Sequence, residues 1–410
     1  LAIFLATVKE KALKDSRGDV EALTAEDGET FMSCLQCGTC TSVCPWNRVS
    51  SYSPRQILRQ LALDAGTEQS IDDAVWSCVT CNACGVNCPR GIELIDVMQA
   101  VREFNVSGGR TPGLFEAPLA SLKNEGNPWG SAREKRTEWS GHLNIPGYKP
   151  AHEYCLFTCC TTAYDPDNRE ASQALPRLLE SASVSFGTLG TAESCCGDPA
   201  HQIGAPELFS QLAQQNSGLF LQAGVQKILT TSPHCLNAFK HHYADLKGAV
   251  ESEHYSELLY RLVEEGRLEP TRKLAYTVTY HDPCYLGRHN RIYEAPRRLL
   301  QSVPGLTLIE MASNRENSLC CGGGGGGAWS NVPPQQRLGV LRIEEALSTG
   351  AEVIATACPY CIRMLSEAIR QLGVQDQIVV RDLAELLLQS VTIKDEALMT
   401  EGVDQEVCHV

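Results

Sequence analysis

Hydrophobic positions along the chain follow two periods, and their order divides the sequence into three regions. In residues 151–395, short apolar runs rich in β-forming residues alternate with segments whose apolar positions recur at helical spacing. This alternation predicts α/β architecture with mostly parallel strands. Residues 106–150 are rich in Gly, Pro and Trp without a sustained period, so we expect a linker along the surface. In residues 1–105, Ser53 and Pro54 predict the start of an inward-packing helix.

The third region repeats its own order of elements. Its first half contains the strand-like runs YCLFT, VSFGT and KILTT, and its second half contains AYTVTY, LTLIEM and VIATA at matching places. Helical segments around 174–183 and 295–303 also correspond, as do those starting at Pro206 and Pro334. Two copies of one α/β unit, related by pseudo-symmetry, explain this correspondence. The expected α+β multidomain chain has a helical domain at 1–105, a linker at 106–150, α/β units at 151–268 and 269–395, and a tail at 396–410.

Composition narrows the classes of function. The 410-residue chain carries a formal net charge of −14, which argues against nucleic acid and acidic lipid surfaces as main partners. No run approaches the roughly 20 apolar residues that a membrane helix needs. The opening LAIFLATV is too short to span a bilayer and lacks a charged flank typical of a signal peptide. It fits the start of a buried helix, and the alternative is the tail of an upstream membrane segment.

Twenty cysteines are the strongest chemical signal in the chain. They lie in tight groups whose members are too close in sequence to pair easily as disulfides, so metal ligation in a reducing cytoplasm explains them better. Two groups share the spacing C-x₂-C-x₂-C-x₃-C-P of bacterial two-cluster ferredoxins, in which the fourth cysteine of each run ligates the other cluster. Zinc is disfavoured because its sites rarely pack three cysteines so closely. The spacing predicts one cubane [4Fe–4S] cluster on Cys34, Cys37, Cys40 and Cys88, and a second on Cys78, Cys81, Cys84 and Cys44.

A different cysteine pattern occupies the second half of the repeat. Cys284 is followed by Cys320-Cys321-Gly322 and then by Cys358-Pro-Tyr-Cys361. This pattern resembles the cysteine-rich CCG domain of heterodisulfide reductases, and the whole chain resembles the fused form of that family, with a helical ferredoxin domain before two CCG domains. Similar proteins include the heterodisulfide reductase D-type component, a subunit of sulfite-reduction complexes, and subunits that oxidise electron-transfer flavoprotein. The resemblance implies a non-cubane [4Fe–4S] cluster held by Cys284, Cys320, Cys321, Cys358 and Cys361.

Neighbouring residues fit this expectation. The cysteines follow predicted strands, where parallel sheets place their ligands, and a helix expected to begin at Cys361 directs its N-terminus at an anionic cluster. The run Gly322–Gly327 lacks the Lys-Ser/Thr of a phosphate loop. We expect it to donate backbone N–H groups to cluster sulfur and to leave space for a substrate or partner. His281 is expected either to supply a proton to a thiolate product or to tie a strand to a loop.

The first half of the repeat has an incomplete set of cysteines. Those at the first four positions are Cys160, Cys195, Cys196 and Cys235. Ala238 stands where the last cysteine is expected, and Cys155 is expected in the core. Four thiolates could hold a cubane cluster or zinc, or stand empty, unless Cys159 or Cys155 supplies a fifth. We therefore expect an absent or non-catalytic centre here, and about 12 iron atoms per chain rather than about 16.

Two functions fit these motifs. The first is an electron-transfer subunit that passes single electrons between the cubane clusters and the non-cubane cluster, as a relay between a flavoprotein and a quinone-linked haem or membrane subunit. The alternative is a heterodisulfide reductase-like catalytic subunit that cleaves a disulfide substrate in one-electron steps. The stretches HDPCYLGRHNRIYEAPR and CCGGGGGGAW resemble the flavoprotein-linked members, which favours the relay. We expect a cytoplasmic location, with membrane association through a partner or an upstream segment as the alternative.

Overall fold

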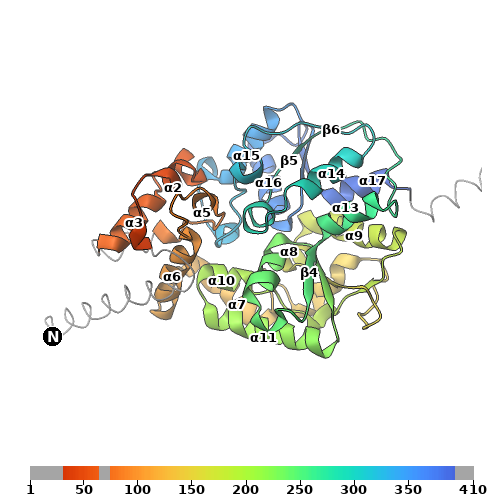
Figure 1. Ribbon diagram of the computed structural model, residues 1–410, viewed down its shortest axis with the longest axis horizontal. Helices are drawn as coiled ribbons and strands as arrows, with labels where there is room; N and C mark the ends of the chain where they lie inside the picture. Colours follow the sequence, from red (N-terminus) through yellow and green to blue (C-terminus); the bar gives the residue numbers. More distant parts are fainter. Residues whose placement is uncertain (1–30, 64–73, 393–410) are drawn as a thin grey trace, which may run out of the picture.

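The computed structural model describes residues 31–63 and 74–392, which form three neighbouring parts (Figure 1). A small helical part, red to orange in Figure 1, lies beside two larger units in yellow-green and blue. The expectations for the opening LAIFLATV and for the tail at 396–410 concern positions outside the described residues. Among the described residues, no helix combines the length and the hydropathy that a membrane crossing needs.

The N-terminal part is helical, as expected. Ser53 precedes α3 and its hydroxyl accepts a hydrogen bond from the Gln56 N–H at 3.4 Å, which agrees with the expected N-cap. Ile57 and Leu58 of α3 are buried against α6, which supplies Leu94 and Val97 to the same core. The helices of this part are α2 (Thr39–Ser42), α3 (Pro54–Leu63), α5 (Ala83–Val86) and α6 (Leu94–Ser107).

Residues 106–150 carry more structure than the expected surface linker. They include α7 (Glu116–Glu125) and a 3-10 segment, Arg133–Ser140. Leu122 on α7 is fully buried against the first α/β unit, and Trp139 belongs to the core that both units share. Isolated large apolar residues anchor this segment, and such anchors leave no period in the sequence.

Two parallel sheets with the same strand order form the units that follow. The first has the order β2-β1-β3-β4 and the second β6-β5-β7-β8, which confirms the internal repeat and the α/β prediction. Each central strand is flanked in the same way, with Cys155 opposite Ile228 in the first sheet and Thr279 opposite Ile354 in the second. The strands are β1 (Tyr154–Phe157), β2 (Phe186–Gly187), β3 (Lys227–Thr230), β4 (Glu251–His254), β5 (Thr277–Tyr280), β6 (Thr307–Leu308), β7 (Val353–Thr356) and β8 (Val379–Asp382).

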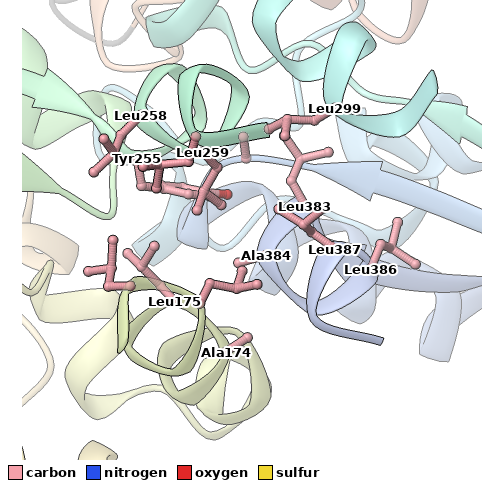
Figure 2. Close-up of a cluster of buried hydrophobic side chains, with 14 of the residues drawn as sticks. Ala174, Leu175, Tyr255, Leu258, Leu259, Leu299, Leu383, Ala384, Leu386 and Leu387 are labelled. Carbon is pink, nitrogen blue, oxygen red and sulfur yellow. The ribbon is translucent and has the colours of Figure 1, made fainter. Parts of the chain in front are cut away.

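Helices of the two units pack reciprocally across the boundary. Helix α9 of the first unit lies against α17 of the second, and α13 of the first lies against α14 of the second. Figure 2 shows Leu175, Leu259 and Leu387 from these helices turned toward one another. The two units therefore share one apolar core. Their helices are α8 (Cys160–Tyr164), α9 (Arg169–Ser181), α10 (Asp198–Ile203), α11 (Pro206–Gln222), α12 (Pro233–Asn237), α13 (Tyr255–Glu264), α14 (Glu294–Ser302), α15 (Leu338–Leu347), α16 (Pro359–Leu372) and α17 (Leu383–Ser390).

Two helix starts differ from the prediction. The segment at Pro334 forms a short 3-10 turn, and α15 begins only at Leu338. Helix α16 begins at Pro359 with Cys358 as its N-cap, so Cys361 lies within its first turn rather than at its start. A proline at the first helical position needs no N–H partner there, which explains the earlier start of α16.

Candidate functional site

The cysteines of the two ferredoxin-type runs surround two separate cavities. Gly38 at φ +86° turns the chain directly before α2, which brings Cys40 back toward Cys37. Cys88 lies with the first run and Cys44 with the second. One cavity is lined by Cys34, Cys37, Cys40 and Cys88, and the other by Cys44, Cys78, Cys81 and Cys84.

The cysteines of the second α/β unit form a buried chain of neighbouring thiols, each at most 7% exposed. The Cys361 and Cys321 sulfur atoms are 3.5 Å apart, and Cys320 shares hydrogen bonds with Cys284 and Cys321. Cys358 joins through Cys361. Cys284 and Cys358 follow the carboxyl ends of the adjacent strands β5 and β7. The structure thus brings together all five cysteines predicted for this half of the repeat.

Backbone and imidazole groups donate to this second thiol group. The Gly322 N–H donates to the Cys320 sulfur at 3.3 Å, and Gly322 holds a φ of +92° that glycine adopts readily. His281 has its Nδ1 occupied by the Nε–H of Arg342 at 3.0 Å, so the hydrogen of a neutral ring lies on Nε2. His281 also hydrogen-bonds the Cys321 thiol. Burial lowers the pKa of His281, which keeps the ring a neutral donor at this site.

The glycine run does not leave the expected space for a substrate. Gly325 packs so closely on the ferredoxin-type loop that a Cβ atom there would lie 2.0 Å from the Cys78 carbonyl oxygen. A Cβ on Gly324 would lie 2.5 Å from the Val79 carbonyl oxygen. These glycines permit close backbone contact between two parts of the chain. The prediction of open space after Gly322 is therefore wrong, because this chain's own loop fills it.

The first α/β unit also brings five thiols together. The Cys160 and Cys195 sulfur atoms are 3.6 Å apart. Cys159 shares hydrogen bonds with Cys160 and Cys235, and Cys196 shares them with Cys195 and Cys235, which closes a ring. Ala238 is buried at the position of the missing fifth cysteine. Cys159, which the sequence suggested only as a substitute, supplies the fifth thiol from the end of β1.

The ferredoxin-type part and the second α/β unit meet at their cysteines. Cys81 shares a hydrogen bond with Cys320, and together with a favourable charge from Arg288 this outweighs burial and lowers the pKa of Cys81 to about 6. Arg288 also donates from Nε to the Cys81 carbonyl oxygen at 2.6 Å. Trp46 and Tyr285 cover this junction in a shared apolar cluster. Two thiol groups far apart in sequence are therefore in direct contact.

Buried arginines accompany the buried thiol groups. Arg102 lies within electrostatic range of Cys78, Arg136 of Cys160, and Arg288 of Cys81, Cys284 and Cys320. These three arginines are at most 3% exposed. A buried guanidinium is costly unless negative charge balances it, and iron-bound thiolates supply such charge. The donor sets, which are sulfur-rich and supported by cations and N–H groups, fit anionic iron–sulfur clusters.

Comparison with known proteins agrees with this chemistry. Residues 30–92 match the family described as a 4Fe-4S dicluster domain, and residues 154–240 and 278–366 each match the family described as a cysteine-rich domain, CCG. The chain therefore consists of a dicluster ferredoxin domain and two CCG domains. It belongs to the heterodisulfide reductase D-like, CCG-domain iron–sulfur proteins, and it is an iron–sulfur oxidoreductase with a role in electron transfer.

Three relatives illustrate the family. The chain is 36% identical to a probable iron-sulfur-binding oxidoreductase, FadF, of Bacillus subtilis, over 78% of this chain and 47% of the relative. It is 31% identical to the EtfAB:quinone oxidoreductase of Syntrophomonas wolfei, over 87% and 57%. It is 29% identical to the D-type component of the dihydromethanophenazine:CoB--CoM heterodisulfide reductase of Methanosarcina barkeri, over 91% and 97%. The chain thus spans about half the length of the first two of these relatives.

Proposed function

We propose that this chain is an electron relay in which the ferredoxin domain exchanges single electrons with a non-cubane [4Fe–4S] centre in the second CCG domain. The observation that carries this proposal is the contact between Cys81 and Cys320, because it joins a predicted ligand of one centre to a predicted ligand of the other. Iron–sulfur clusters supply one-electron chemistry when bound at such sites. The chain's own residues hold the two sites together and keep water from the junction between them.

The proposed ligands follow the grouping of the thiols. Each cavity of the ferredoxin domain has four cysteines for one cubane cluster: Cys34, Cys37, Cys40 and Cys88 in one, and Cys44, Cys78, Cys81 and Cys84 in the other. The second CCG domain has five thiols for the non-cubane cluster: Cys284, Cys320, Cys321, Cys358 and Cys361.

The first CCG domain is proposed to hold a further centre. Its five neighbouring thiols are each at most 3% exposed, and Arg136 lies near Cys160. Thiols so close together and so well buried fit a metal centre better than an empty relic, because deprotonated sulfur there needs a cation. Occupancy of this site would raise the iron content from about 12 to about 16 atoms per chain.

A relay between a flavoprotein and a quinone-linked membrane subunit is the proposed setting. The name of the Syntrophomonas wolfei relative, an EtfAB:quinone oxidoreductase, supports this choice of partners. The burial of all five thiols in the second CCG domain also favours electron transfer over direct attack on a substrate, since a disulfide would need an opening to reach them. Disulfide cleavage, suggested by the heterodisulfide reductase relative, is the alternative.

Replacement of Cys321 by alanine tests the proposed function. Cys321 lies between Cys320 and Cys361, so no neighbouring thiol can take its place. We expect the variant to lose about four iron atoms per chain, the paramagnetic signal of the second CCG centre, and electron transfer from reduced flavoprotein to a quinone analogue. Cys155→Ala serves as the control, because Cys155 is a buried cysteine outside the thiol groups. An unchanged paramagnetic spectrum in Cys321→Ala would contradict the ligand assignment.

A further inference from the structure

One histidine of the first CCG domain reaches into the site of the second. His234 immediately precedes Cys235 and is only 4% exposed. Its ring shares a hydrogen bond with the Cys358 thiol, although Cys358 belongs to the other half of the repeat. Tyr285 stacks on one side of the ring with centroids 4.0 Å apart, and Tyr360 packs against it at 4.8 Å. Aromatic packing therefore holds the imidazole in one orientation between the two thiol groups.

A carboxylate fixes the other edge of the same ring. Nδ1 of His234 lies 2.9 Å from Oδ2 of Asp198, which is 3% exposed and begins α10 directly after the first Cys-Cys-Gly sequence. Gln202, one turn further along α10, donates to the same Asp198 oxygen and accepts from the Thr80 hydroxyl at 2.9 Å. Asp198 is thereby held in place by a chain of hydrogen bonds that reaches the ferredoxin domain.

The two edges of the ring have different consequences for the sulfur. An iron-bound thiolate carries no hydrogen, so a hydrogen bond between His234 and Cys358 needs the hydrogen on the ring nitrogen. Asp198 accepts the hydrogen of Nδ1 and supplies the negative charge that lets both ring nitrogens carry hydrogen. The same logic applies to metal-bound histidine, where a carboxylate behind the ring orients it and sets its hydrogen positions.

We propose that His234, oriented by Asp198, donates a hydrogen bond to the Cys358 sulfur and thereby raises the reduction potential of the second CCG centre. The inference rests on the proposed function, since it takes Cys358 as an iron ligand. A donor at a ligand sulfur stabilises the more negative, reduced form of a cluster. The first CCG domain, whose motif lacks the final cysteine, thus contributes a positioning residue to the complete site of the second.

The test is a redox titration of the anaerobically purified protein, followed by paramagnetic resonance. The signal of the second CCG centre is identified as the one that Cys321→Ala removes. We expect His234→Leu to lower the midpoint potential by the equivalent of a tenfold change in the ratio of reduced to oxidised centre, about 59 mV for one electron. Asp198→Asn should shift the potential in the same direction while it keeps the shape of the side chain.

A matched control comes from the same segment of the first CCG domain. His242 contacts His201, Phe209 and Asn237, all within its own half of the repeat. We expect His242→Leu to leave the potential of the second CCG centre at the wild-type value.

The outcomes separate the two proposals. A wild-type potential in Asp198→Asn and in His234→Leu, with normal iron content, overturns the role of His234. If His234→Leu loses iron, the potential of Asp198→Asn alone decides, and an unshifted value overturns the inference. If wild-type protein shows no signal that depends on Cys321, the proposed function itself fails and this inference fails with it.

Discussion

Individual cysteines in this chain differ by their neighbours rather than by their burial. Cys155 lies within β1 and Cys159 follows its end, and both are at most 1% exposed. Burial raises the pKa of Cys155, whose side chain packs in an apolar cluster. Burial acts the same way on Cys159, but hydrogen bonds from Cys160 and Cys235 outweigh it and lower the pKa well below the usual value. Of the two, Cys159 is therefore the one prepared to bind a metal as thiolate.

Alanine variants of these two cysteines test the first CCG centre. We expect Cys159→Ala to lower the iron content by about four atoms per chain, because it opens the ring of five thiols. Cys155→Ala should leave iron unchanged and should cost only the packing of a small side chain. Iron and protein determinations on both purified variants provide the measurement. Equal iron content in wild type and Cys159→Ala would show that Cys159 holds no metal.

The role of Cys159 also marks the limit of sequence reasoning at this scale. Alignment of the two repeats correctly places Ala238 at the position of the last cysteine, because spacing alone defines that position. The direction of the Cys159 side chain could not be read in the same way. It depends on β1 ending at Phe157 and α8 beginning at Cys160, and boundaries of elements are set by tertiary packing rather than by local pattern.

At the scale of elements, the start of α17 combines a cap with a contact between domains. Asp382 accepts from the Ala384 N–H at 2.8 Å and forms a capping box with Glu385. The Tyr255 hydroxyl of the first CCG domain donates to the same carboxylate at 2.7 Å. Burial raises the pKa of Asp382 to about 7 and that of Glu385 to about 8. One buried carboxylate thus links a helix end to the neighbouring domain.

The raised pKa of Asp382 predicts a pH-dependent stability. A carboxyl group whose folded pKa is raised binds its proton more tightly when folded, so its contribution to stability is full below about pH 4 and is lost as pH rises through about 7. Asp382→Asn keeps the cap and the acceptor for Tyr255 but cannot ionise. We expect the variant to be more stable than wild type by roughly 1–3 kcal/mol at about pH 8, and the difference to shrink towards about pH 5.

Thermal unfolding under anaerobic conditions at these two pH values measures this difference. Each comparison is made between variant and wild type at one pH, so that loss of clusters in acid affects both proteins alike. A stability difference that is independent of pH would contradict the assignment to Asp382.

Elements were predictable where a period was present. The parallel strands and most helices of both CCG domains follow from apolar runs and helical spacing. Residues 106–150 were not, because Leu122 and Trp139 act as single anchors without a repeat. The late start of α15 was also missed, since the prolines before it favour a short 3-10 turn as readily as a helix.

At the scale of the whole molecule, Arg102 ties the three domains together. Its side chain is fully buried on α6. The guanidinium donates to the carbonyl oxygens of Cys78 in the ferredoxin domain, Gln202 in the first CCG domain and Gly325 in the second, at 2.6, 2.7 and 3.1 Å. No sequence pattern indicates this role, because an arginine on a helix is usually exposed.

Removal of this guanidinium should loosen the assembly. We expect Arg102→Met to destabilise the protein by about 3 kcal/mol or more, since several buried carbonyl groups lose their donor. Limited proteolysis should then cut between the ferredoxin domain and the CCG domains. Arg59→Met, on the exposed face of α3, is the control and should change neither property. Equal unfolding free energies for Arg102→Met and wild type would refute the role of Arg102 as a tie.

The order of the proposed centres leads to a final prediction about the electron path. Cys40 lies in the cavity with Cys34, Cys37 and Cys88, whereas Cys81 lies in the other cavity and contacts Cys320. The contact between thiols therefore joins the second cavity, rather than the first, to the second CCG domain.

We expect Cys40→Ser to remove about four iron atoms, to stop electron transfer from donor to acceptor, and to leave the paramagnetic signal of the second CCG centre intact. Cys81→Ser should disturb that signal as well, because its sulfur is a neighbour of Cys320. Both CCG domains should remain folded in Cys40→Ser, since the described residues of their shared core come from outside the ferredoxin domain. Electron transfer at the wild-type rate in Cys40→Ser would show that electrons bypass the first cavity, and the proposed order of centres would then be wrong.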